Sequence, residues 1–295
     1  MSNNGTNMPF GFLNINKPKG MTSFDVISKL RKILNIKQIG HAGTLDPFAT
    51  GVLPIAIGKA TKILEFLPSD KKYIATVQFG KNTTTYDLEG EITDIFDKKV
   101  SKEEILEALK NFEGEILQIP PIYSAIKKEG KKLYEYAREG KTIEITPRKI
   151  TIHKINLIEF DKISQQGEIL VECSGGTYIR SIAYDLGKSL NCGAHLIELE
   201  RTMAGKFLID NSIKLEDIKD KEFLIDKIIN PIDVTNIKSV NLTDSEAKKI
   251  SHGIPINNNG FQNLDIVFLV YSGKIHGIGL VAKDKILAKK VFEVL

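Results

Sequence analysis

Two spacings of apolar residues recur along the chain and predict its secondary structure. Alternation of apolar and polar positions predicts strands over residues 10–16, 73–80, 148–160, 168–175 and 195–202. A spacing of three to four residues predicts one helix that begins at Thr22 or Ser23. It predicts further helices over residues 101–112, 132–139 and 177–190. Strands and helices therefore alternate irregularly, which is typical of an α+β fold with a mixed sheet.

Two of these elements carry polar side chains at informative positions. Alternation places Tyr73 on the apolar side of its strand, together with Ala75 and Val77. In the helix over residues 177–190, Ile179 and Ile182 face inward, and Arg180 falls in the first turn.

The pattern changes around NPIDVTN, residues 230–236, which is loop-like. We therefore predict a larger domain over residues 1–233 and a small, mainly β domain over residues 236–295. In the small domain, a helix near residues 243–251 precedes short strands with glycine turns.

Composition places the chain among ordinary globular proteins, with 42% hydrophobic and 26% charged residues. The opening MSNNGTNM lacks the basic and apolar parts of a signal peptide, and no later stretch has the length of a membrane span. Two cysteines are too few for a disulfide framework or a cysteine zinc cage, and no two histidines are four residues apart. We expect a cytoplasmic protein without metal.

Charge is distributed unevenly although the net charge is only +4. Residues 1–37 carry six Lys or Arg against one acid, and residues 236–295 carry eight Lys against five acids. A third basic run, KKEGKKLYEYAREGK, interleaves Tyr134 and Tyr136 with cations. Such surfaces suit a polyanion with stacking bases, although a solvated lysine-rich surface explains any single run equally well.

Several common catalytic motifs are missing. GVLPIAIGKAT has six residues between Gly51 and Gly58, whereas a Walker motif has four between its two glycines, and Ala60 stands where Ser or Thr would bind magnesium. The zinc-deaminase signature and the Gly-x-Ser-x-Gly elbow do not occur.

The stretch GHAGTLDPFATGVLPIAIGKATK contains a single acid, Asp46. Gly43 and Gly51 permit unusual backbone conformations, and Pro47 restricts Asp46 to an extended one, so the carboxylate has a fixed direction. On these residues alone, an Asp-Pro pair that forms a turn is the simpler interpretation.

The same stretch resembles the catalytic motif of the TruB family of tRNA pseudouridine synthases. Further segments resemble the family in order from about residue 11 to 207: NINKPKGMTS, KKYIATVQFGKNTTTYDLEGEI, QIPPIYSAIKKEGKKLYEYAREG, GGTYIRSIAYDLG and RTMAGKF. The last sixty residues are similar, more weakly, to the PUA-type RNA-binding module of bacterial members. The resemblance implies a pseudouridine synthase catalytic domain followed by a PUA-like domain.

Residue roles follow from the resemblance, position by position. It implies that Asp46 is the catalytic aspartate, that Arg180 pairs with it, and that Tyr73 stacks on the target base. It implies that His41 fills the gap left by the everted base. The full set of implied RNA-binding positions is His41, Lys62, Leu199, Lys17 and Lys19.

The implied reaction converts the uridine at position 55 of the tRNA T-loop into pseudouridine without a cofactor. A carboxylate can stabilise or attack the oxocarbenium centre that forms when a glycosidic bond breaks, and a nearby guanidinium favours the anion. Whether Asp46 attacks the ribose or the base stays open. The alternatives are a tRNA-folding helper that acts on the T-arm and a hydrolase of a glycosidic bond. We expect a monomer whose partner is tRNA.

Overall fold

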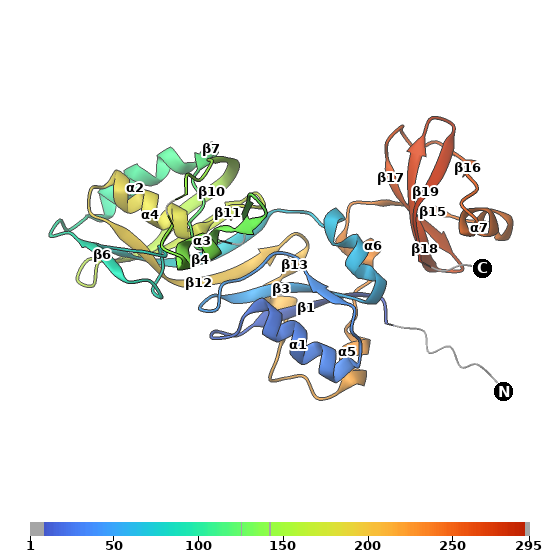
Figure 1. Ribbon diagram of the computed structural model, residues 1–295, viewed down its shortest axis with the longest axis horizontal. Coiled ribbons are helices and arrows are strands. Elements are labelled where there is room, and N and C mark those ends of the chain that lie inside the picture. Colours follow the sequence, from blue (N-terminus) through green and yellow to red (C-terminus); the bar gives the residue numbers. More distant parts are fainter. Residues whose placement is uncertain (1–8, 125, 142, 293–295) are drawn as a thin grey trace.

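The computed structural model describes residues 9–124, 126–141 and 143–292 (Figure 1). The polar opening segment and the last three residues of the expected β domain, 293–295, lie outside the described residues. Within them, the chain forms two separate main sheets, the first of ten strands and the second of five.

The first sheet is mixed and contains the strands predicted from alternation. Its path runs in the order β14-β1-β3-β12-β4-β11-β10-β7, with β2 paired to β3 and β13 paired to β12. Parallel pairing joins β1 to β14 and β3 to β12, and the other pairs are antiparallel. The strands are β1 (Gly11–Lys17), β2 (Ile39–His41), β3 (Thr50–Ile57), β4 (Lys71–Phe79), β7 (Gly114–Gln118), β10 (Arg148–Asp161), β11 (Gln166–Cys173), β12 (Ala194–Ala204), β13 (Phe207–Leu208) and β14 (Ile213–Lys214).

Helices pack on this sheet and bury its apolar face. Helix α4 (Ile179–Ser189) packs on β12, α2 (Lys102–Leu109) packs on β10, and α1 (Ser23–Leu34) contacts β2. Thr22 and Asp25 form a capping box that starts α1, so its predicted beginning is confirmed. The remaining elements of this part are η1 (Gly58–Phe66), β5 (Lys81–Thr83), β6 (Ile92–Ile95), η2 (Lys110–Phe112), β8 (Lys127–Lys128), β9 (Lys131–Lys132), α3 (Leu133–Arg138), η3 (Ile209–Asn211), α5 (Lys221–Asp226) and α6 (Pro231–Val234).

Strand β12 lies at the centre of the first sheet, between β3 and β4. Its register places Arg201 opposite Tyr73 and Leu199 opposite Ala75. Gly51 of β3 makes the close contact with β12 possible, because a Cβ there would lie 2.3 Å from the Arg201 carbonyl oxygen. The register thus brings Tyr73 and Arg201, which are far apart in the sequence, next to each other in the sheet.

The second sheet follows α6 and has the order β15-β17-β18-β19-β16. Its elements are β15 (Lys238–Asn241), α7 (Asp244–Ser251), β16 (Ile256–Asn257), β17 (Ile266–Tyr271), β18 (Lys274–Ala282) and β19 (Lys285–Val291). This is the small β-rich unit expected from the sequence, and Figure 1 shows it beyond α6, away from most of the first sheet. The domain boundary at residues 233–236 stays a prediction.

A shared apolar cluster joins the two sheets. Phe12 and Ile63 from the first part and Phe268 and Phe292 from the second are all buried in it. Lys290 forms an ion pair with Glu65 of η1 at its edge. In the described part of the chain, no helix has the length and apolarity to cross a membrane.

Candidate active site

Asp46 lies in the loop between β2 and β3, which neighbouring segments hold in place. The Gly20 amide donates to the Pro47 carbonyl at 2.8 Å, and the Leu45 amide donates to Ser23 Oγ at 2.9 Å. The side chains on either side of it in the turn, Leu45 and Phe48, are buried. The Asp46 side chain keeps 34% of its surface exposed, so it is enclosed on most sides and open on one.

Arg180, in the first turn of α4, holds the Asp46 carboxylate with two nitrogens. Its Nε lies 3.0 Å from Asp46 Oδ2, and its Nη2 lies 3.3 Å from Oδ1. The remaining donors are also engaged: Nη1 donates to Asp87 Oδ2 at 3.1 Å and Nη2 to the Tyr123 carbonyl at 3.0 Å. This paired arrangement fixes both the position and the orientation of the carboxylate.

Asp87 also belongs to this cluster. It lies in the segment KKYIATVQFGKNTTTYDLEGEI, but the sequence analysis gives it no role. It is buried, and its Oδ1 accepts from Thr85 Oγ1 at 2.5 Å and from the Glu89 amide at 3.0 Å. Asp87 therefore anchors the side of Arg180 that faces away from Asp46. Its sequence signal is weak, because it is one of three closely spaced acids, Asp87, Glu89 and Glu91, after a polar TTTY run.

Opposing effects act on the protonation of Asp46. Burial raises the pKa of this carboxyl above its usual value, and the Asp87 charge adds to the rise, whereas the Arg180 guanidinium and the Lys17 ammonium oppose it. The anion therefore depends on Arg180 to stay available near neutral pH.

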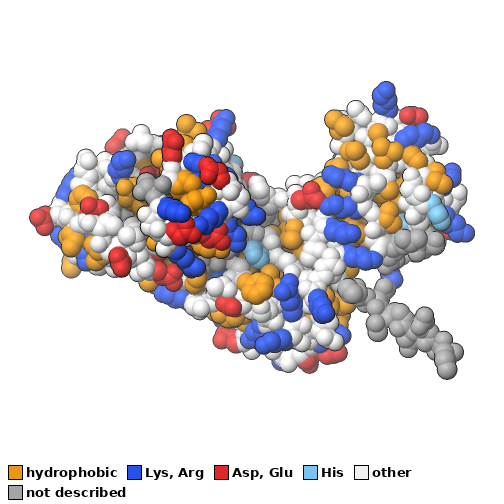
Figure 2. Space-filling model, in the orientation of Figure 1, with side chains coloured by type: hydrophobic (Ala, Val, Ile, Leu, Met, Phe, Trp, Pro, Cys, Tyr) orange, Lys and Arg blue, Asp and Glu red, His pale blue; other side chains and the backbone are white. Residues whose placement is uncertain are grey.

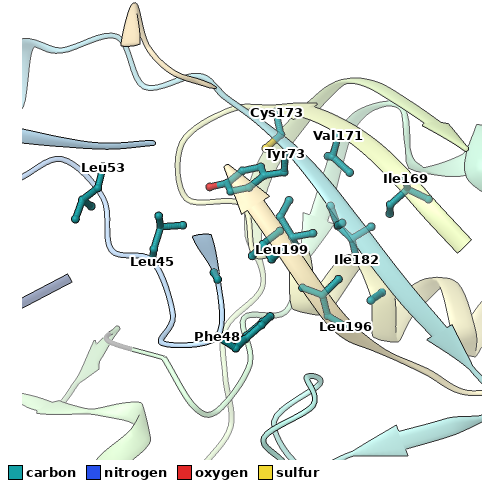
Figure 3. Close-up of a cluster of buried hydrophobic side chains, with 14 of the residues drawn as sticks. Leu45, Phe48, Leu53, Tyr73, Ile169, Val171, Cys173, Ile182, Leu196 and Leu199 are labelled. Atoms are coloured by element: carbon teal, nitrogen blue, oxygen red, sulfur yellow. The ribbon is translucent and has the colours of Figure 1, made fainter. Parts of the chain in front are cut away.

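Tyr73 lies on the apolar face of β4, as alternation predicts, and is 5% exposed. Figure 3 shows its ring beside Cys173 and its hydroxyl oxygen turned to the side of Leu45 in the Asp46 loop. Burial raises the pKa of the phenol, so it stays neutral. Leu199 is buried in the same apolar cluster as Tyr73.

His41 is the last residue of β2 and is half-buried, five positions before Asp46. Burial lowers the pKa of its imidazole, and the Arg201 charge lowers it further. The neutral ring is the form that these surroundings favour, and it has the flat apolar faces that stack on bases.

The three lysines singled out from the sequence differ in their surroundings. Lys17 is fully buried, and its Nζ donates to the carbonyls of Pro18, Met21 and Pro47 at 3.0, 2.6 and 3.2 Å. Direct contact between Lys17 and RNA, expected from the sequence, does not fit this position; the ammonium holds the loop instead. Lys19 and Lys62 are exposed, on the neighbouring loop and on η1.

Arg201 is a second residue that sequence reasoning passed over. It is fully buried; its Nε donates to the Val52 carbonyl at 2.7 Å and its Nη2 to the Gly43 carbonyl at 3.0 Å. Alternation in HLIELERT gives the signal that could have found it, because Arg201 follows Leu199 on the inward side. A buried arginine in a strand points to a role at the site.

Groups of metal-binding side chains are absent from the part of the chain that the structure describes: no three His, Cys, Asp or Glu residues there could hold an ion. The expectation that no metal is needed stays a prediction. The chemistry available is thus that of one oriented carboxylate, a neutral tyrosine and a neutral histidine.

Comparisons with known proteins find one family over most of the chain. Residues 31–179 match the model of the TruB family pseudouridylate synthase N-terminal domain, and residues 180–235 match that of the tRNA pseudouridylate synthase B C-terminal domain. A protein named tRNA pseudouridine synthase B from Clostridium novyi (strain NT) is 44% identical, covering 92% of this chain and 95% of its own. One of that name from Staphylococcus saprophyticus subsp. saprophyticus is 42% identical, covering 96% and 99%.

A solved structure shares the fold across most of the chain. It is described as a crystal structure of a Cbf5-Nop10-Gar1 complex, and the matching chain has a TM-score of 0.71 and 27% identity. The match covers 97% of this chain and 85% of that one. A second, an H/ACA RNP bound to a substrate RNA containing 2'-deoxyuridine, has a TM-score of 0.70 and 26% identity, covering 97% and 86%.

Proposed function

Because the chain belongs to the TruB family of pseudouridylate synthases, we propose that it isomerises a uridine of tRNA to pseudouridine. The target that the family motifs imply is the uridine at position 55 of the T-loop. The observation that carries this proposal is the Asp46 carboxylate, held by Arg180 and open on one side.

The reaction breaks the N1–C1′ bond of the nucleotide, turns the uracil and rejoins it through C5. No group is gained and no oxidation state changes, so the reaction requires no cofactor. Breaking the bond builds positive charge at C1′, which an adjacent carboxylate stabilises or attacks. Asp46 has the correct charge for either role, and Arg180 keeps it ionised and aimed.

A base inside a folded loop must leave its stack to reach Asp46, at a cost of a few kcal/mol. Tyr73 and Leu199 offer an apolar surface for the everted base, and an aromatic contact of this kind contributes about 1 to 3 kcal/mol. His41 lies on the same loop as Asp46, where its neutral ring can occupy the vacated position.

Recognition of the T-arm is proposed to fall to cations at the surface away from the carboxylate, some of them half-exposed and paired, as Lys131 is with Glu139. In the segment over residues 127–141, Lys131 lies 5.0 Å from the Tyr136 ring centre, and Arg138 lies 5.3 Å from that of Tyr134. Figure 2 shows a notch between the part of the molecule built on the first sheet and the part built on the second. Lys and Arg side chains lie along both sides of this notch. Contacts of these cations with phosphates would give affinity that falls with salt.

Replacement of Asp46 by asparagine tests the proposal. Asp46→Asn keeps the shape but removes the charge, so pseudouridine formation in a T-arm hairpin should fall at least about a thousandfold, in line with the loss of a group essential to the reaction. Release of tritium from 5-tritiated uridine measures the rate, and gel shift measures binding, which should stay near the parent value. Glu89→Gln is the matched control, because Glu89 is a neighbouring exposed acid whose loss should leave turnover near normal.

The two alternatives predict different products. A tRNA-folding helper needs binding but no oriented carboxylate, so Asp46→Asn would leave its biological activity intact. A hydrolase would release free uracil, whereas isomerisation leaves the mass of the RNA unchanged. Mass spectrometry of the hairpin after incubation with the purified chain, without added metal or nucleotide, separates these outcomes.

We also propose that the protein acts as a monomer in the cytoplasm. Cys173 and Cys192 are free and buried, which suits a reducing compartment. Light scattering of the purified chain after size-exclusion chromatography tests the oligomeric state, and a mass near twice 32.9 kDa would contradict it.

A further inference from the structure

A groove of about 260 Å³ lies beside the Asp46 loop, between η1 and the beginning of β4. Gly43 of the loop, Lys71 of β4 and Gly205 beyond β12 are among the residues that line it. The groove is separate from the carboxylate of Asp46 but borders the same loop. No residue of it has a role in the chemistry described above.

Lys71 reaches this groove because of the alternation of β4. Residues 71 and 73 point to the same side of the strand, so Lys71 shares the face of Tyr73. A Cβ on Gly43 would lie 3.1 Å from Lys71 Nζ, which places the ammonium against the Asp46 loop. Lys72 points to the opposite face, where it forms an ion pair with Glu172 at 2.8 Å.

The Lys71 ammonium lacks a counter-ion among the described residues. No carboxylate there lies within ion-pair distance of its Nζ, and no acceptor hydrogen-bonds to it. The one acid in the groove, Glu65, is already paired with Lys290. An ammonium in a partly enclosed groove costs free energy unless an anion joins it.

Arg201 adds a second positive charge behind Lys71. The same Cβ position on Gly43 would lie 3.4 Å from Arg201 Nη1, and this nitrogen is buried without a hydrogen-bond partner in the described structure. Burial and the Arg201 charge both lower the pKa of Lys71. Two neighbouring cations with no acid between them favour a bound anion.

We propose that Lys71, with the charge of Arg201 behind it, binds one phosphodiester of the RNA backbone next to the everted nucleotide. The inference rests on the proposed function, since RNA is the anion that this protein would engage. Positions 71 and 73 of a strand are about 7 Å apart, a distance that one nucleotide can span. A base against Tyr73 therefore brings a neighbouring phosphate within reach of Lys71.

A pair of variants tests the subsite, both in the Asp46→Asn background so that the RNA is bound without turnover. Lys71→Met should weaken binding of a T-arm hairpin about tenfold, as expected for loss of one charged contact. The slope of log K against log salt should become shallower by about 0.7 to 0.9. Lys72→Met removes a cation one residue away on the opposite face and should change neither quantity.

Stability without RNA separates a binding role from a structural one. Because Lys71→Met removes a half-buried cation that has no counter-ion, its melting temperature without RNA should equal or exceed that of the parent. A binding role thus predicts weaker RNA binding in a protein that is no less stable. Equal losses of stability and binding would overturn the proposal.

Neutral linkages in the RNA give a second measurement that does not depend on folding of a variant. A methylphosphonate at one linkage beside the target uridine should weaken binding by the Asp46→Asn protein about tenfold, and the same linkage should have no further effect on Lys71→Met. The proposal is wrong if no linkage shows this dependence, or if Lys71→Met keeps the parent affinity and salt slope. If the wild-type chain forms no pseudouridine in the hairpin, the proposed function itself is wrong. If pseudouridine forms but the binding tests fail, only the Lys71 subsite is wrong.

Discussion

The Arg180 guanidinium connects three chain segments that are far apart in sequence. It donates to Asp46, to Asp87 and to the Tyr123 carbonyl, and it is only 7% exposed. Removing it leaves two carboxylates close together in a largely enclosed place, where both cannot easily stay ionised. Arg180 therefore keeps Asp46 ionised and also fixes the direction of its carboxylate.

The pH dependence of turnover follows from this cluster. Burial raises the pKa of Asp46 above its ordinary value of 3.8, and the reaction uses the anion, so the rate should fall with decreasing pH at a pH above that value. Arg180→Gln removes the main opposing charge and should move the acid limb to higher pH. Single-turnover rates from pH 4 to about 8 measure the limb. An acid limb at the same pH in both proteins would contradict this account.

Lys17 should make stability depend on alkaline pH. Burial lowers the pKa of its ammonium from 10.5 to about 8 in the folded protein. Between these values the unfolded chain binds more protons than the native one, so the free energy of unfolding rises with pH, by up to about 3 kcal/mol. Urea denaturation of wild type and Lys17→Met from about pH 7 to 10 should show a steeper rise in the wild type, because Lys71, whose pKa burial also lowers, remains in both proteins.

Sequence reasoning found only part of the cluster, for physical reasons. Asp46 stands out as the single acid of its loop, and Arg180 falls in the first turn of a periodic helix, but their pairing is what the family resemblance implies. Asp87 lies 93 positions from Arg180, and Arg201 lies 158 positions from Gly43, whose carbonyl it binds. Contacts over such separations depend on sheet register, which local patterns do not contain.

At the scale of elements, local spacing predicts which segments form strands and helices but not their neighbours. The alternation in residues 73–80 and the helical spacing after Thr22 each describe one segment on its own, and both are confirmed as β4 and α1. Nothing in either pattern indicates that β12 separates β3 from β4. That arrangement arises from contacts between apolar faces across the whole sheet.

Gly51 provides a test of that close approach. It has φ +100°, and a Cβ would lie 2.3 Å from the Arg201 carbonyl oxygen, so Gly51→Ala should lower the free energy of unfolding by about 3 kcal/mol or more. Gly20→Ala is the control: its φ is +84°, and a Cβ there meets no atom within 4 Å. It should cost only about 1 to 2 kcal/mol. Equal losses of unfolding free energy for Gly51→Ala and Gly20→Ala in urea denaturation would show that the positive φ alone, and not the close contact with β12, sets the cost.

At the scale of the whole molecule, the two sheets are joined by an apolar contact. Phe292 is 4% exposed, its ring centre lies 5.4 Å from that of Phe10, and Lys59 donates to its backbone carbonyl. The Lys290–Glu65 ion pair lies at the exposed edge of the same contact. The apolar cluster, more than the ion pair, should therefore hold the second sheet in place.

Phe292→Ala should separate the behaviour of the two sheets. Loss of a buried phenyl ring costs about 3 to 5 kcal/mol. We expect the second sheet to unfold at a lower temperature in its own calorimetric transition, and the segment over residues 230–241 to become sensitive to protease. Glu65→Gln is the control and should leave the calorimetric trace nearly unchanged. A single unshifted transition in Phe292→Ala would contradict the role of the cluster.

The central place of β12 has a consequence for how the protein is made. Translation produces β3 and β4 well before β12, and until residues 194–204 leave the ribosome those two strands have no partner between them. The nascent chain must therefore carry exposed strand edges through much of its synthesis, a state that chaperones commonly protect. A nascent chain stalled before residue 194 would contain both Asp46 and Arg180 and would still lack the strand that closes the sheet around them.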